Sequence, residues 1–155
     1  MELEMNTTAW HQHVLDFHTY WTSLRHGDTL PAKSWFDPAA VPHLLASLWV
    51  IEIHQDPLRF RTRLAGTHFR EILGQELTGN WIDALYPDNQ AELPARLIEV
   101  VETGKRNWRR GRPNFRLDHG FCEVENIILP FAEDGHVVDY LILPAKCFVY
   151  CFQIN

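Results

Sequence analysis

Hydrophobic and polar positions alternate most regularly in residues 58–64, where four mostly apolar residues occupy every second position and three arginines lie between them. A period of two places the apolar set on one face of a β-strand. Residues 48–53 form a nearly continuous apolar run, as in a central strand covered on both faces. An Asp-Pro pair between the runs favours a turn. The pattern therefore predicts an antiparallel hairpin that ends at Gly66, followed by a helix beginning near Thr67.

A second apolar pattern, with spacings of three and four residues, predicts an amphipathic helix before the hairpin. Gly27 marks the end of this helix. Two roles remain open for its stripe of bulky side chains: packing on the domain's own sheet, or pairing with a second copy as a homodimer interface. The stripe consists of Trp10, Val14, Phe17, Trp21 and Leu24.

Shorter patterns predict the remaining elements. Residues 30–46 carry three prolines and indicate an extended connection with a short helix. Residues 67–74 and 88–102 predict two helices, with one helical turn at 81–85 between them. Pro94 indicates that the longer helix either starts late or is kinked. Strand-like runs then follow at 105–117, 120–131 and 136–143, with a possible continuation at 148–152 past Pro144.

This order of elements predicts an α+β fold. Two strands, a helical insert and three further strands make a five-stranded antiparallel sheet with helices on one face, preceded by the N-terminal amphipathic helix.

The composition of the 155-residue chain fits one ordinary globular domain. The formal charge is −6, so neither nucleic acid nor a membrane surface is expected as a partner. No apolar run approaches the about 18 residues that a membrane span needs, and no signal peptide is visible. Three cysteines, Cys122, Cys147 and Cys151, are too few for a disulfide framework. We therefore expect a cytoplasmic protein with reduced thiols.

Nine histidines raise the question of a metal site. His11 and His13 are two residues apart, which places them on different sides of a helix, and no spacing typical of a zinc site occurs. No metal is expected, and no catalytic serine or cysteine motif is present. Residues 105–116 mix arginines with Trp108 and Phe115, as nucleic-acid surfaces do. The overall acidity favours a solvated strand face instead, with an acidic protein partner as the next interpretation.

Three phrases in order resemble a bacterial PAS family of small stand-alone proteins, formerly catalogued as a domain of unknown function. They are WFDPAAVPHLLASLWVIEI, PLRFRTRLAGTHFREILGQELTGNWID and ILPFAEDGHVVDYLI. The resemblance covers residues 30–143 and implies a sheet whose inner face and helices enclose a small cavity. It marks no flavin-binding cysteine and no haem-binding histidine, so neither cofactor is expected. The PAS domain is placed at 30–144, after an N-terminal helix at 1–29 and before an extension at 145–155.

The strand at 120–131 is expected to supply part of the inner face of this cavity. Asn126 is a polar residue among apolar neighbours there, and a buried amide has to be hydrogen-bonded, either to the backbone or to a ligand. A cavity filled and closed by aromatic side chains is the alternative to a ligand pocket. The residues predicted to line the cavity are Phe69, Trp81, Leu97, Ile98, Trp108, Cys122 and Asn126.

The predicted function is that of a non-catalytic signalling module. It binds a small ligand or a protein partner, forms a homodimer, and signals through contacts with another protein. A ligand that binds one conformation better shifts its population, and the N-terminal helix carries the change outward. The alternatives are a protein-interaction adaptor with a closed core and a small enzyme that uses the cavity.

Overall fold

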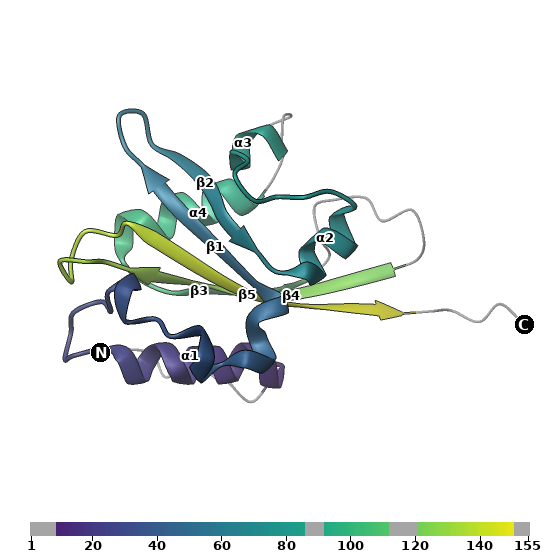
Figure 1. Cartoon of the computed structure of the whole chain (residues 1–155), viewed down its shortest axis with the longest axis horizontal. Coiled ribbons are helices and arrows are strands. Elements are labelled where there is room, and N and C mark those ends of the chain that lie inside the picture. The colour runs from purple at the N-terminus through teal and green to yellow at the C-terminus, as the bar shows by residue number, and fades with distance from the viewer. Residues whose placement is uncertain (1–8, 86–91, 112–120, 151–155) are drawn as a thin grey trace, which may run out of the picture.

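The computed structural model describes residues 9–85, 92–111 and 121–150, and they form one five-stranded antiparallel sheet (Figure 1). The strands lie side by side in the order β2-β1-β5-β4-β3. The predicted α+β fold is therefore confirmed. Their bounds are β1 Leu48–His54, β2 Arg59–Ala65, β3 Asn107–Gly111, β4 Phe121–Phe131 and β5 Tyr140–Tyr150.

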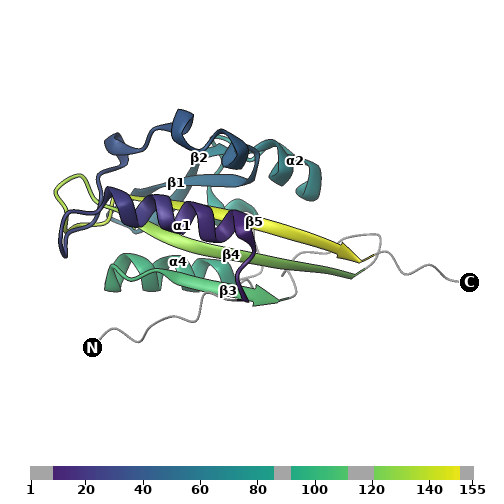
Figure 2. The same ribbon diagram turned by 90° about the horizontal axis from the view of Figure 1, so that it is seen from below.

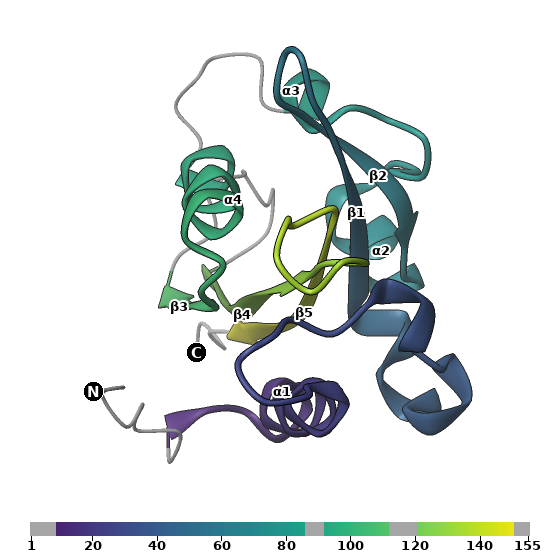
Figure 3. The ribbon, with the colours of Figure 1, turned by 90° about the vertical axis from the view of Figure 1, so that its left-hand side faces the viewer.

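Helices cover both faces of the sheet. The first helix, α1, packs on β4 and β5, whereas α4 lies on the opposite side (Figures 2 and 3). We call the face under α1 the outer face and the other the inner face, which α2 and α4 cover. The α-helices are α1 Gln12–Leu24, α2 Thr67–Leu73, α3 Ile82–Leu85 and α4 Glu92–Thr103, and short 3-10 helices occur at η2 Lys33–Trp35, η3 Pro38–Ala40 and η4 Pro42–Ser47.

The β1–β2 hairpin and the start of α2 form as predicted, but the alternating pattern holds only for part of β2. Phe60 and Thr62 are buried, and Arg61 between them is exposed. Leu64, predicted on the same apolar face, is 58% exposed, because the pairing register with β1 shifts between Thr62 and Leu64. The strand ends at Ala65, and α2 begins after Gly66. Gly74 ends α2 in the left-handed conformation, with a φ of 68°, which favours glycine.

The apolar stripe of α1 packs on the chain's own sheet. Val14, Phe17 and Trp21 are at most 1% exposed, and the indole N–H of Trp21 donates to the Pro130 carbonyl of β4 at 2.9 Å. Trp10 is also buried, and Leu24 is partly buried against the same core. Of the two roles left open by the sequence, packing on the sheet is the one observed. The predicted homodimer interface on this stripe is corrected accordingly, because its side chains are already covered.

Two further element boundaries can be compared with the prediction: the start of α4 and the bounds of β5. Pro94 is the third residue of α4 as described, and the predicted start at residue 88 lies outside the described residues. The last strand begins at Tyr140, later than predicted, and runs through Pro144 without a break. Pro144 lies opposite Leu48, the first residue of β1, where pairing with that strand ends. The boundary predicted after residue 144 therefore falls inside β5.

Candidate functional site

The inner face of β4 carries the amide that the sequence places in the expected cavity. Asn126 lies between Arg109 on β3 and Ala145 on β5, and it is 9% exposed. Its Oδ1 has no hydrogen-bond partner within the described part of the chain. A buried acceptor without a donor costs about 1–3 kcal/mol. This amide therefore marks a place where an added hydrogen-bond donor is energetically favoured.

Two other predicted lining residues, Phe69 and Leu97, are buried on the inner side of the sheet. The Phe69 ring of α2 lies 5.4 Å from the Trp49 ring of β1, measured between centroids. The Trp49 indole N–H donates to Thr62 Oγ1 at 2.9 Å. This tryptophan–threonine pair was not predicted, although the alternation in β2 places Thr62 on the apolar face and so provides a signal for it.

Three predicted lining residues do not lie within the inner layer. Ile98 is 38% exposed on α4. Trp108 of β3 stacks on Trp10 at 5.8 Å, which places it on the outer face under α1. Trp81 forms a bridge with Arg61 at the edge of the sheet. The prediction grouped these residues by their apolar character, which does not distinguish the two covered faces of this sheet.

The cysteines give a different result from the one expected. Cys122 belongs to β4, but its side chain lies outside the described residues. Cys147 of β5 is disulfide-bonded, which corrects the expectation of reduced thiols for that residue.

A buried arginine connects α4 to the edge strand on the inner side. Arg96 is only 7% exposed. Its Nε donates to Asn107 Oδ1 at 2.9 Å, and its Nη2 donates to the Asn107 carbonyl at 3.1 Å. Asn107 Nδ2 in turn donates to Glu99 Oε2 at 3.1 Å. These bonds fix the position of α4 over β3, and thus the distance between this helix and the inner face of the sheet.

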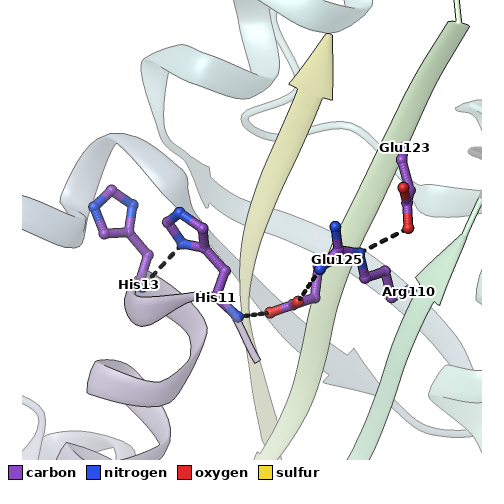
Figure 4. A network of polar contacts seen from close by, with 5 residues as sticks. All are labelled: His11, His13, Arg110, Glu123 and Glu125. Carbon is purple, nitrogen blue, oxygen red and sulfur yellow. Dashed lines mark hydrogen bonds and ion pairs between the residues drawn. The ribbon is translucent and has the colours of Figure 1, made fainter. Parts of the chain in front are cut away.

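A network of polar contacts attaches α1 to the outer face (Figure 4). Glu125 of β4 is fully buried, and its Oε2 accepts from the backbone N–H of His11 at 2.8 Å. Arg110 of β3 lies 3.7 Å from the other carboxylate oxygen and donates to Glu123 Oε1 at 2.7 Å. Burial raises the pKa of Glu125, although the His11 N–H and the Arg110 charge act in the opposite direction.

Arg110 belongs to the basic segment at 105–116, and its role here is to hold two carboxylates of the same chain. Residues 112–120, the rest of that segment, lie outside the described residues. The observed contacts of Arg110 therefore agree with a structural use of this arginine.

Histidines cluster where α1 begins. His11 is the N-cap residue, just before the helix, and its Nδ1 accepts from the His13 N–H at 3.1 Å. The two rings lie 5.0 Å apart, and the His13 ring lies 6.3 Å from that of His43. His43 Nε2 is 3.3 Å from Asp16 Oδ2. The expectation that His11 and His13 lie on different sides of a helix is wrong because His11 is not part of the helix.

His18 lies farther along α1, between two indoles. Its ring is 5.1 Å from Trp10 and 6.0 Å from Trp21, and its Nε2 is buried without a partner among the described residues. Burial, with smaller contributions from Arg106 and Arg25, lowers the pKa of His18 from 6.5 to about 4. The ring is therefore uncharged in the folded protein at neutral pH.

The lowered pKa of His18 predicts a loss of stability in acid. The folded state excludes a proton that the unfolded chain binds below pH 6.5, so stability is complete above that pH and falls down to about pH 4. A shift of this size corresponds to at most about 3 kcal/mol, and because the ring is only partly buried the expected loss is about 1–2 kcal/mol. Urea unfolding between pH 7.5 and 4.5 measures it.

A leucine at position 18 is expected to remove this part of the pH dependence, because it fills a similar space and has no ionisable group. The matched control is His136→Leu at an exposed position in the β4–β5 turn. Equal pH profiles for the wild type and His18→Leu would contradict the prediction.

Within residues 9–85, 92–111 and 121–150, no group of three or more His, Cys, Asp or Glu side chains is arranged to hold a metal ion. In the same ranges, no helix is long and apolar enough to cross a membrane.

Comparison with known proteins agrees with the fold and with the resemblance seen in the sequence. The family model described as PAS domain matches residues 9–142, which include α1 and most of the sheet. No curated protein matches the sequence closely enough to count as a relative. Since the family model spans most of the chain and the sheet has the five antiparallel strands expected of the fold, this chain belongs to the PAS domain family.

Proposed function

We propose that this chain is a cytoplasmic, non-catalytic PAS module that binds a small ligand, or a segment of a protein partner, on its inner face and signals through α1. Membership of the PAS family supports the general sensory or regulatory role. The observation that carries the specific proposal is the buried Asn126, whose Oδ1 lacks a donor among the described residues. The occupant has to supply an O–H or N–H group to this oxygen.

The chemistry of the inner layer limits the rest of the occupant. Ile128 lies two positions from Asn126 on the same face of β4, and it is completely buried. Leu97 on the covering helix is completely buried as well. An occupant with one hydrogen-bond donor and otherwise apolar surface fits such surroundings, since small-ligand sites combine apolar walls with few polar groups.

Strand β4 provides a connection between the two faces of the sheet. Glu125 and Asn126 are consecutive, so their side chains point to opposite faces. Asn126 faces the inner layer, whereas Glu125 binds the backbone N–H of His11 on the outer face. A ligand that pulls on Asn126 moves the same stretch of backbone that positions Glu125. We infer that α1 carries the change outward.

The output then passes to another protein. A second copy of the chain is one candidate for this partner, although the stripe on α1 is already covered. Light scattering of concentrated protein tests it, and a single species of monomer mass would remove the homodimer from the proposal.

Native mass spectrometry of freshly purified protein tests the binding proposal. We expect an additional mass on the wild type that is lost in Asn126→Leu, which keeps the branching of the side chain but removes the acceptor. Ile128→Val is the matched control, because it loosens the same face without touching the amide, and it is expected to retain the added mass. A wild type without any added mass would support the alternative of an adaptor with a closed core.

The same leucine variant gives a separate prediction for stability. In protein freed of ligand, Asn126→Leu is expected to raise the free energy of unfolding by about 1–2 kcal/mol, because it removes a buried acceptor that has no donor. Urea unfolding of both proteins measures the difference. A loss of stability would mean that Asn126 is already hydrogen-bonded within the chain.

A further inference from the structure

We propose that the start of α1 is attached to the sheet by a proton-sensitive contact, in which uncharged His11 holds the helix in place and protonation of its ring releases it. We call the three residues His11, His13 and Glu125 the α1 anchor. The inference concerns a proton, so it stands whether or not a ligand binds to the inner face.

The cap of α1 requires the uncharged form of His11. Its Nδ1 accepts a hydrogen bond from the backbone N–H of His13 at 3.1 Å. An imidazole nitrogen accepts only while it carries no proton, and both nitrogens are donors in the charged ring. Protonation of Nδ1 therefore turns an attractive contact into two opposed N–H groups and leaves a helix N-terminus uncapped.

The same residue also carries the attachment to the sheet. The backbone N–H of His11 donates to Glu125 Oε2 at 2.8 Å (Figure 4). The His11 ring also lies 5.5 Å from the ring of Phe148 on β5. Cap and attachment thus belong to one residue. A change that displaces the His11 ring also displaces the N–H on which the contact with Glu125 depends.

The charges around His11 oppose its protonation. Lys146 of β5 and Arg110 of β3 repel a positive ring, and the positive end of the α1 dipole does the same. Asp16 acts in the opposite direction but is the weakest of these effects, and it already contacts His43. The titratable and charged groups that contact or act on His11 are His13 and Asp16 of α1, Arg110 of β3, Glu125 of β4 and Lys146 of β5. His43 of η4 and Glu123 of β4 lie one contact farther away, against Asp16 and Arg110.

The direction of the pH effect follows from these surroundings. Burial, followed by the charges of Lys146 and Arg110, lowers the pKa of His11 below its ordinary value of 6.5, and burial also lowers that of His13. The attached state thus binds fewer protons than the released state. Attachment is complete above about pH 6.5 and weakens as the pH falls below that value.

Glu125 contributes with the opposite sign, in a lower range of pH. Burial raises its pKa, so the attached state takes up this proton more readily than the released state does. This contribution favours attachment only as the pH falls towards the ordinary range of a carboxyl group, near 4.5. The release driven by His11 is therefore seen most clearly in the upper part of the range, above pH 5.5.

Hydrogen exchange of the α1 amides in the full chain tests the proposal, with each rate divided by the intrinsic rate at the same pH. Between pH 7.5 and 5.5 the wild type is expected to lose more protection than His11→Asn, by at most about tenfold, because asparagine caps a helix without titrating. His136→Asn is the matched control and is expected to lose as much protection as the wild type. The α4 amides are expected to show no such difference between the proteins.

A second variant keeps the test decisive. His11→Ala removes the cap at every pH, so its α1 amides are expected to be less protected than those of the wild type already at pH 7.5. Equal losses of protection in the wild type and in His11→Asn overturn the proposal, since the other histidines of α1 then account for the whole effect. Full protection of α1 in His11→Ala at pH 7.5 overturns it as well.

Discussion

Trp21→Ala is expected to lower the free energy of unfolding by about 4–5 kcal/mol. The side chain is 1% exposed between α1 and the sheet, and truncation of such a residue leaves a large cavity. The substitution also removes the hydrogen bond from the indole to the Pro130 carbonyl, which contributes about 1 kcal/mol. Urea unfolding monitored by far-ultraviolet circular dichroism measures the loss.

Trp35→Ala is the matched control for this prediction. Trp35 is the same residue type in η2, but it is 46% exposed, so its removal is expected to cost less than about 1 kcal/mol. Trp21→Phe separates the two contributions, because it keeps most of the ring volume and removes only the donor. Similar losses for Trp21→Ala and Trp35→Ala would mean that α1 does not pack on the sheet in solution.

Gly66→Ala is expected to destabilise the protein by about 3 kcal/mol or more. The φ of Gly66 is −65°, so backbone conformation is not the obstacle. A Cβ at this position would lie 2.3 Å from the Ala46 carbonyl oxygen and 2.5 Å from that of Leu45. Both are backbone atoms of η4, which cannot move aside as a flexible side chain does. The variant therefore has to separate η4 from the junction of β2 and α2.

Thermal unfolding measures this loss, which corresponds to a decrease in Tm of about 10 °C for a chain of this length. Gly111→Ala is the matched control, because among the described residues a Cβ there meets the Arg109 guanidinium, at an ordinary distance of 3.5 Å. That variant is expected to stay within about 1 kcal/mol of the wild type. A Gly66→Ala protein as stable as the wild type would show that η4 does not lie against Gly66.

Much of the fold could be predicted because its local patterns agree with the final structure. The alternation in β2 places Phe60 and Thr62 on the buried side, and Gly66 and Gly74 mark the two ends of α2 as glycines commonly do. Such signals depend on neighbouring residues alone. They therefore remain readable before the tertiary contacts are known.

The site residues were harder to predict because both faces of the sheet are covered. In a sheet with one solvent-exposed face, an apolar side chain identifies the face that packs on the core. Here the second face is covered as well, and Trp108 lies on it beneath Trp10. Glu125 looks like a solvent-facing strand residue in the sequence, and only the start of α1 explains why a carboxylate is buried there. Asn126 was found because a lone amide in an apolar run has to be satisfied wherever the faces lie.

The edge of β2 that does not pair with β1 has a consequence for how this protein behaves at high concentration. The N–H of Thr62 donates to the Asn80 carbonyl at 2.9 Å, and the N–H of Gly79 donates to the Thr62 carbonyl at 2.8 Å. The guanidinium of Arg59 lies 3.9 Å over the ring of Trp81 and holds this segment beside the strand. Bare strand edges recruit strands from other molecules and so begin the growth of fibrils. At high concentration β2 is therefore a poor template for ordered aggregation, because the backbone N–H and carbonyl groups in the middle of its edge are already hydrogen-bonded within the same chain.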